Sequence, residues 1–219
     1  MRYLKFMDNE LKAIEFTKEQ KALIKEVMES PEFNHVDWSN DSLESLRSSI
    51  RSHYRNAQKF LCCYCKNPVS LTSAANCQVE HIAPKSRYKN FIFTAKNLCV
   101  ACADCNSAKQ SIDVIKPLPS NKKRTRYPTT SQFLIVHPHF DIYSEHIRKF
   151  GERFYFPRTK KGENTRTICK LDKGIEALGY FDSPESLKDF ELIAQIMDAT
   201  VKKDTNKKNI LKKLLIESI

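Results

Sequence analysis

The sequence predicts an α+β fold in which helices flank a short central segment of strands, turns and cysteine pairs. Apolar residues recur at helical spacing on both sides of that segment, whereas residues 61–112 change to short β-prone runs. Five of the eight cysteines fall into two tight clusters within these residues. With 41% hydrophobic and 29% charged residues, the composition is that of a globular protein rather than a disordered one.

The first third of the chain is expected to be helical. Thr17 and Gln20 have the spacing of a capping box, and the helix they begin is expected to end at Ser30-Pro31. A second helix is predicted from Asp41 to Leu61, with Asp41 and Glu44 as its capping pair. Along one face of it, basic residues recur every four positions, which fits either a solvated face or a phosphate-contacting stripe. These residues are Arg47, Arg51, Arg55 and Lys59.

The central segment predicts a strand, a basic loop, a second strand and a short helix. The strands are expected at Val79–Ile82 and Leu98–Ala101, and the helix at Cys105–Ile112. Further on, residues 133–136 and 153–156 are apolar enough to form strands, which we expect to pair with each other. Helices are expected from Ser183-Pro184 and over 210–219, the last of them closing the core rather than docking a partner.

Composition excludes several classes of function. The chain has only four glycines and no phosphate-binding loop pattern, so we do not expect it to bind and hydrolyse ATP by itself. It has no apolar run long enough to span a membrane, and its first residues lack the apolar core of a secretory signal. We therefore expect a cytoplasmic protein. A net charge of +11 favours a polyanionic partner.

Two C-x-x-C pairs predict a structural zinc site. Cys62 with Cys65 and Cys102 with Cys105 can place four thiolates around one tetrahedral Zn²⁺, with no open position for water. Cys63 is excluded because the 62/65 pair reproduces the spacing of 102/105. The other thiols are expected in the core, and they are Cys77, Cys99 and Cys169.

These cysteines frame a further set of polar residues in a specific order. The positions concerned are Cys62, Tyr64, Cys65, Glu80, His81, Pro84, Asn97, Leu98, Cys102, Cys105, Asn106 and Lys109. On these residues the chain resembles the HNH endonucleases, the ββα-metal or His-Me finger family. The resemblance implies a ββα-metal nuclease core over residues 61–115. A helical region over 1–60 and a mixed, mainly helical extension over 116–219 are expected to flank it.

The resemblance also implies roles in the hydrolysis of DNA phosphodiester bonds. His81 would be the general base that accepts the proton of the attacking water. Glu80 and Asn106 would hold one catalytic Mg²⁺ or Mn²⁺ ion through oxygen atoms. Asn106 stands where many members have His. Glu80 is one methylene longer than the more common Asp, so we expect it to hold the ion through water or at an altered geometry.

Other residues would support these three. Asn97 would orient His81 through a side-chain or backbone hydrogen bond and so select its tautomer. Basic side chains near the site would neutralise DNA phosphates. Those implied are Lys85, Arg87 and Lys109.

The segment from His137 through His139 to Asp141, with His146, is expected to form a structured turn against the nuclease unit. A second metal site there is less expected, because the spacing of its donors is not diagnostic.

Two alternatives to a nuclease acting alone stay open. The basic charge and the four cysteines would also suit a non-catalytic zinc-ribbon module that binds nucleic acid. The other alternative is a subunit whose amphipathic C-terminal helix docks an ATPase, which is compatible with a nuclease. The set Glu80, His81, Asn97 and Asn106 favours the nuclease, because a binding module needs no general base beside oxygen ligands. The arrangement of the chain is also similar to the HNH subunits of bacterial anti-phage systems such as Septu and some retrons. That similarity implies an ATPase partner subunit and a role in antiviral defence.

Overall fold

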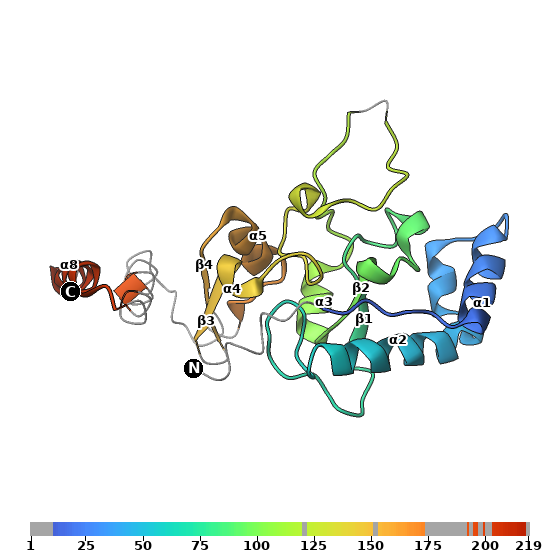
Figure 1. Cartoon of the computed structure of the whole chain (residues 1–219), viewed down its shortest axis with the longest axis horizontal. Helices are drawn as coiled ribbons and strands as arrows, with labels where there is room; N and C mark the ends of the chain where they lie inside the picture. The colour runs from blue at the N-terminus through green and yellow to red at the C-terminus, as the bar shows by residue number, and fades with distance from the viewer. Residues whose placement is uncertain are drawn as a thin grey trace. The chain divides into compact units, whose positions relative to one another are not determined.

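The computed structural model describes residues 11–119, 122–150, 153–173, 192, 195–196, 199 and 203–217 (Figure 1). The chain divides into two compact units, residues 1–148 with 157–171 and residues 149–156 with 172–219. All the residues that were assigned chemical roles lie in the first unit. The three-part division expected from the sequence stays a prediction.

The N-terminal helices follow the predicted pattern with shifted ends. Helix α1 spans Lys18–Glu29 and begins at the expected capping box of Thr17 and Gln20. Helix α2 is shorter than predicted and spans Glu44–Ala57. Asp41–Leu43 forms a separate 3₁₀ turn, so Asp41 and Glu44 do not cap α2, which has no side-chain cap. The helix ends early because residues 59 and 60 adopt φ of 52° and 62°.

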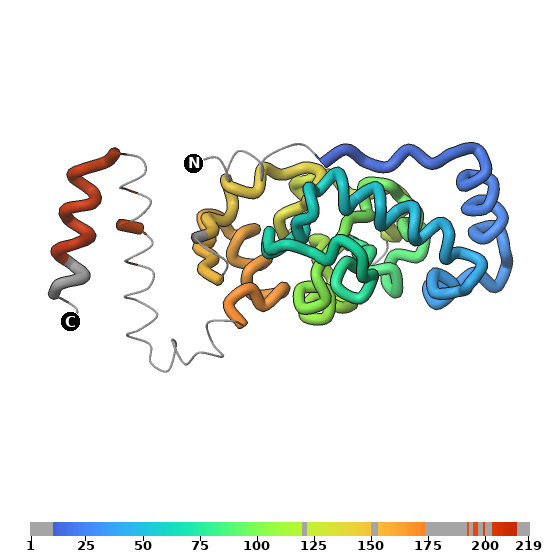
Figure 2. Tube along the Cα trace, turned by 90° about the horizontal axis from the view of Figure 1, so that it is seen from below, coloured from blue at the N-terminus to red at the C-terminus, as the bar shows by residue number. Residues whose placement is uncertain are grey.

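Helix α2 covers the central sheet and contacts the segment that precedes α1. Its buried face carries Leu46, Ile50 and Tyr54, and it packs against both strands of the sheet. The Tyr54 hydroxyl accepts from the Ile14 amide, so residues 11–17 run along α2, as Figures 1 and 2 show. The core therefore lies between α2 and the central sheet.

The basic side chains that recur along α2 bond largely to other groups of the protein. Arg47 binds the Glu44 carboxylate and the carbonyl oxygens of Trp38 and Asn40. The guanidinium of Arg55 donates to the Cys77 sulfur. This part of the row is neither a solvated face nor a free phosphate stripe, because tertiary partners use its charges.

The central unit has the predicted order of elements. Strand β1 (Gln78–His81) pairs antiparallel with β2 (Leu98–Ala101), with Glu80 opposite Cys99 and His81 opposite Leu98. Helix α3 spans Ala103–Lys109 and packs on β1. It starts two residues earlier than predicted and ends where Gln110 adopts a φ of 45°.

The C-terminal part differs more from the sequence predictions. Residues 133–136 form no strand; Phe133 makes only an isolated bridge with Ile115. The predicted strand at 153–156 is present as β4 (Phe154–Pro157), but its partner is β3 (Ile147–Phe150). A hairpin between neighbouring segments closes a shorter loop than the expected pairing would.

Helices complete this part of the chain. They are α4 (Tyr143–His146), α5 (Lys160–Ile168) and α8 (Thr205–Glu217). Most of the helix predicted from residue 183 lies outside the described residues. The closing role expected for the last helix stays a prediction. Within the described residues, no helix is long and apolar enough to cross a membrane.

Candidate functional site

The two cysteine pairs meet in one buried cluster. Cys62 and Cys65 lie in the turn after α2, which is closed by a bridge between Leu61 and Pro68. Cys102 and Cys105 lie at the start of α3. The four sulfur atoms are within 4.8 Å of one another.

The spacing of these sulfurs fits zinc. A tetrahedron with Zn–S bonds of about 2.3 Å has sulfur atoms about 3.8 Å apart, and the Cys65 and Cys102 sulfurs are separated by 3.8 Å. Although burial raises it, hydrogen bonds from Cys102 and Cys105 bring the pKa of the Cys62 thiol well below its usual range. Hydrogen bonds within the cluster also lower the pKa of the Cys102 thiol and raise the pKa of the Cys65 and Cys105 thiols. A metal would bind all four as thiolates.

The remaining cysteines behave as the sequence predicts. Cys77, Cys99 and Cys169 are buried free thiols outside the four-sulfur cluster. Cys63 is also buried, and burial is the main cause that raises the pKa of its thiol well above the usual range. Cys63 does not belong to the group of four sulfurs, which agrees with its exclusion.

A cavity of about 420 Å³ brings three of the predicted site residues together. Glu80 and His81 reach it from β1 and Asn106 from α3, and the N-terminal 3₁₀ turn His35–Ser39 contributes Trp38 to its wall. The four-cysteine cluster adjoins the cavity, since Cys105 and Asn106 are consecutive in α3. Trp38 carries no signal in the sequence for this position, because it lies more than 40 residues before His81.

His81 is held in one orientation by a carbonyl and by an aromatic ring. Its Nε2 lies 3.2 Å from the Ile92 carbonyl oxygen, which can only accept, so Nε2 carries the proton and Nδ1 is the basic nitrogen. The Trp38 ring meets the imidazole edge-on, with centroids 4.5 Å apart. Burial, together with the charges of Lys85 and Lys109, lowers the pKa of His81 to about 3. The imidazole is therefore neutral at physiological pH.

Glu80 is held through one of its two oxygens. Oε1 accepts from the Tyr64 hydroxyl at 3.0 Å and lies 2.6 Å from the Lys109 ammonium. Tyr64 lies between Cys62 and Cys65 of the first cysteine pair, so this turn positions the carboxylate directly. The sequence pattern included Tyr64 but did not indicate this contact.

Lys109 does not take the role that the sequence suggested. Its side chain has no exposed surface, and its ammonium donates to the His81 carbonyl oxygen at 3.1 Å besides pairing with Glu80. A buried ammonium cannot reach a DNA phosphate, so the expected phosphate contact is wrong. The reason is that α3 packs this residue against β1, a contact between distant parts of the chain.

Asn106 lines the cavity from α3. Its Nδ2 donates to the Gln78 Oε1, so Oδ1 is the remaining polar atom of the amide. An amide oxygen beside a carboxylate is a donor set that suits a hard divalent cation.

Asn97 is fully buried and holds a loop rather than the imidazole itself. Its Oδ1 accepts from the Ala83 amide at 2.7 Å, and its Nδ2 donates to the carbonyl oxygens of Ala83 and Phe91. The expectation of a direct hydrogen bond to His81 is corrected, because Ile92 supplies that bond. Asn97 instead supports the loop that carries Ile92.

Two of the basic side chains that were predicted to contact phosphates are accessible. Lys85 lines the 420 Å³ cavity and donates to the His35 carbonyl oxygen at 3.0 Å. Arg87 is exposed, and its guanidinium donates to the Ser111 carbonyl oxygen at 2.9 Å. Lys85 therefore lies in the cavity wall, and Arg87 lies beside it through its bond to Ser111, which also lines the cavity.

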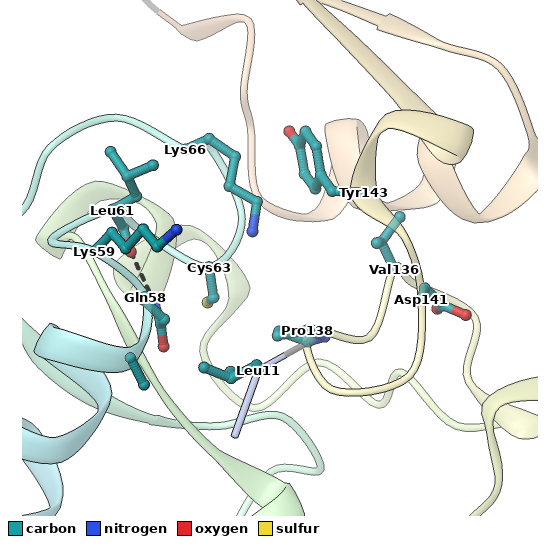
Figure 3. Close-up of a pocket in the computed structure, with 11 residues that line it drawn as sticks. Leu11, Gln58, Lys59, Leu61, Cys63, Lys66, Val136, Pro138, Asp141 and Tyr143 are labelled. Atoms are coloured by element: carbon teal, nitrogen blue, oxygen red, sulfur yellow. Dashed lines mark hydrogen bonds between the residues drawn. The ribbon is translucent and has the colours of Figure 1, made fainter. Parts of the chain in front are cut away.

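A second, smaller cavity lies in the first unit (Figure 3). It measures about 40 Å³ and is lined by Cys63, Lys66 and Tyr143 among others, with the Lys66 ammonium 4.7 Å from the Tyr143 ring centroid. None of the predicted catalytic residues lines it. Its volume suits a water molecule or two rather than a nucleotide.

The His137–Asp141 segment forms the structured turn that the sequence predicts. The amides of Phe140 and Asp141 donate to the His137 carbonyl oxygen. The His139 imidazole reaches the Leu98 carbonyl oxygen of β2 at 2.8 Å, so the turn packs against the central sheet. Among the described residues, these side chains are not part of a metal-binding cluster.

Comparison with known proteins agrees with this geometry. Residues 62–111 match the family model described as HNH endonuclease. A comparison with curated proteins gives no match. The matched range contains both cysteine pairs, β1, β2 and α3. Residues 62–111 of this chain therefore form an HNH endonuclease domain, with four cysteines that could bind zinc.

Proposed function

We propose that this protein is a metal-dependent endonuclease that hydrolyses phosphodiester bonds of DNA. The observation that carries the proposal is the convergence in one cavity of a neutral imidazole, a carboxylate and an amide oxygen, from His81, Glu80 and Asn106. A protein that only binds nucleic acid has no need for this combination.

In this proposal His81 is the general base. Because Nε2–H is bonded to the Ile92 carbonyl, Nδ1 can accept the proton of the attacking water, and the carbonyl then stabilises the imidazolium. The resting pKa near 3 reflects burial and two nearby ammonium groups. A phosphodiester in the cavity adds negative charge that raises the pKa toward the range useful for catalysis.

Glu80 and Asn106 are the proposed ligands of the catalytic Mg²⁺ or Mn²⁺ ion. The two contacts to Glu80 Oε1 leave Oε2 for an ion, and Asn106 offers Oδ1. Such an ion, when bound, supplies charge stabilisation at the scissile phosphate and the leaving oxygen. Lys85 and Arg87 would neutralise the neighbouring phosphates.

The proposed zinc has a structural role. Four cysteine ligands leave no position for water, and the two knuckles carry Tyr64, which holds Glu80, and Asn106, which follows Cys105. Loss of zinc is therefore expected to displace both proposed ligands of the catalytic ion.

The test is the nicking of supercoiled plasmid by wild type and by His81→Ala, each with Mg²⁺, with Mn²⁺ and with EDTA. The matched control is His53→Ala, because the His53 Nε2 also lies near a backbone carbonyl oxygen, that of Lys12 at 3.0 Å. We expect wild type and the control to cut only with a divalent ion, and His81→Ala to keep its zinc without cutting. Equal cutting by all three proteins would contradict the proposed base.

The same experiment distinguishes the nuclease from the two alternative functions. A zinc-ribbon module that binds nucleic acid would retain zinc and shift DNA on a gel in both wild type and variant, with no cleavage in any metal. A partner-docking subunit would also not cut alone, but its cutting would appear on addition of the partner.

We also propose that the nuclease acts in antiviral defence with an ATPase subunit, in the cytoplasm. The similarity of arrangement to HNH subunits of anti-phage systems supports this, as does the lack of a phosphate-binding loop pattern. The eight free thiols fit a reducing compartment. Purification of the tagged chain from its native host should recover an ATPase. Full activity of the isolated chain, with no ATPase recovered, would contradict the partnership.

A further inference from the structure

A line of hydrogen bonds runs from the His137 turn to Asn97. The His137 Nε2 lies 2.9 Å from the Tyr127 hydroxyl, which in turn lies 3.1 Å from the Asn97 Oδ1 and 3.2 Å from the Lys96 carbonyl oxygen. His137 and Asn97 have no exposed surface. Tyr127 and His137 both lie outside the range that matches the HNH family.

The donors and acceptors of this line have a single consistent direction. The His139 backbone amide donates to the His137 Nδ1 at 3.2 Å, so Nδ1 carries the lone pair and the neutral ring is protonated at Nε2. The His137 Nε2–H then donates to the Tyr127 oxygen. The Tyr127 proton is consequently directed to the Asn97 Oδ1 or to the adjacent Lys96 carbonyl.

The Asn97 amide continues the line to the loop beside His81. With its Oδ1 facing donors, its Nδ2 faces the carbonyl oxygens of Ala83 and Phe91. The Tyr127 ring also packs edge-on against Phe91, with centroids 5.3 Å apart. The next residue is Ile92, whose carbonyl accepts from the His81 Nε2.

We propose that Tyr127 and His137 are positioning residues that hold the 83–92 loop and thereby keep His81 in the tautomer with a free Nδ1. They act through Asn97 and Phe91 and do not touch substrate. The catalytic consequence rests on the proposed function, but the effect on the His81 tautomer does not. This assigns a role to the His137 turn that is separate from metal binding.

The test compares Tyr127→Phe, His137→Leu and His137→Gln in the full-length, zinc-loaded chain. Tyr127→Phe removes the hydroxyl and keeps the ring against Phe91. His137→Leu removes the donor, whereas His137→Gln offers a side-chain N–H in its place. The control is Tyr88→Phe, because the Tyr88 ring also stacks on Phe91 while its hydroxyl bonds to Asp113 away from this line.

Three readouts are needed. Zinc content and melting temperature show that each variant is folded. Nicking kinetics on supercoiled plasmid with Mg²⁺ give kcat and KM separately. Imidazole ¹⁵N spectra report the tautomer of His81 without any substrate or catalytic ion.

We expect Tyr127→Phe and His137→Leu to lower kcat by about tenfold or more with little change in KM, as for other residues that orient catalytic groups. In both variants the His81 spectrum should lose its pure Nε2–H form. His137→Gln and Tyr88→Phe should resemble wild type in both respects.

The proposal is overturned if Tyr127→Phe keeps the wild-type His81 tautomer, or if Tyr88→Phe lowers kcat as much as Tyr127→Phe does. If the wild-type chain cuts DNA neither alone nor with its partner, the proposed function fails and the His81 tautomer alone decides. A changed His81 tautomer in Tyr127→Phe, with the wild-type tautomer kept in Tyr88→Phe, would still support the positioning role.

Discussion

The buried ion pair between Lys109 and Glu80 gives the sharpest test of the site's architecture. The two charged groups are 2.6 Å apart, with side-chain exposures of 0% and 6%. Replacing Lys109 by Met keeps the unbranched apolar stem and removes the ammonium, which leaves the Glu80 carboxylate buried without its cation. Removal of one partner of a buried pair costs about 3–5 kcal/mol. The bond that Tyr64 still donates to Glu80 favours the lower end of that range.

The measurement is thermal unfolding of the zinc-loaded protein. For a chain of this size, 1 kcal/mol corresponds to roughly 2–4 °C, so Lys109→Met should lower the melting temperature by roughly 6–20 °C. The control is Lys160→Met. The Lys160–Glu163 pair has a similar separation of 2.9 Å, but its side chains are 77% and 51% exposed. It should contribute no more than about 1 kcal/mol.

A double variant separates the unpaired charge from the loss of lysine packing. Glu80→Gln combined with Lys109→Met removes both charges, so it should be more stable than Lys109→Met alone. The reasoning is refuted if Lys109→Met unfolds at the same temperature as Lys160→Met. It is also refuted if the double variant is no more stable than Lys109→Met.

Three further predictions address the metal cluster, the buried imidazoles and a close backbone approach. Cys102→Ser should lose zinc and the near-ultraviolet circular dichroism signal of a folded protein, because structural zinc contributes folding free energy directly. The control Cys77→Ser lies outside the cluster and should keep both zinc and signal. Burial lowers the pKa of His137 well below its usual range. Below about pH 6.5 the unfolded chain therefore binds a proton that the folded protein excludes, and the free energy of unfolding should fall on acidification; urea titrations that show no such decline would contradict this. Gly162→Ala should destabilise the protein although alanine favours helices, because the added Cβ would lie 1.9 Å from the His146 carbonyl oxygen; an unchanged or raised melting temperature would oppose it.

Local patterns account for what was predictable in the central unit. The two C-x-x-C pairs, the order of strand, loop, strand and helix, and the capping box of Thr17 and Gln20 each depend on residues a few positions apart. Such patterns act through short chain connections, and the structure confirms them. The pairing of residues 153–156 was predicted wrongly, because apolar composition identifies a strand without identifying its neighbour.

The supports of the site depend on contacts between distant segments, and sequence spacing carries no signal for them. Trp38 and Ile92 reach His81 from different loops, and Tyr127 reaches Asn97 from beyond the matched domain. A basic residue looks the same in a sequence whether it is exposed or buried. Only packing could show that Lys109 faces Glu80 rather than DNA.

The sequence by itself was enough to identify the four-cysteine cluster, the polar residues between the cysteine pairs and therefore the HNH domain. The reason is that zinc binding and hydrolysis require particular side chains at short spacings. The tertiary structure decided which nitrogen of His81 is free, which oxygen of Glu80 is occupied and which of the basic residues are accessible. Those properties follow from burial and from hydrogen bonds made across the fold, where a partner's identity is set by packing rather than by its distance along the chain.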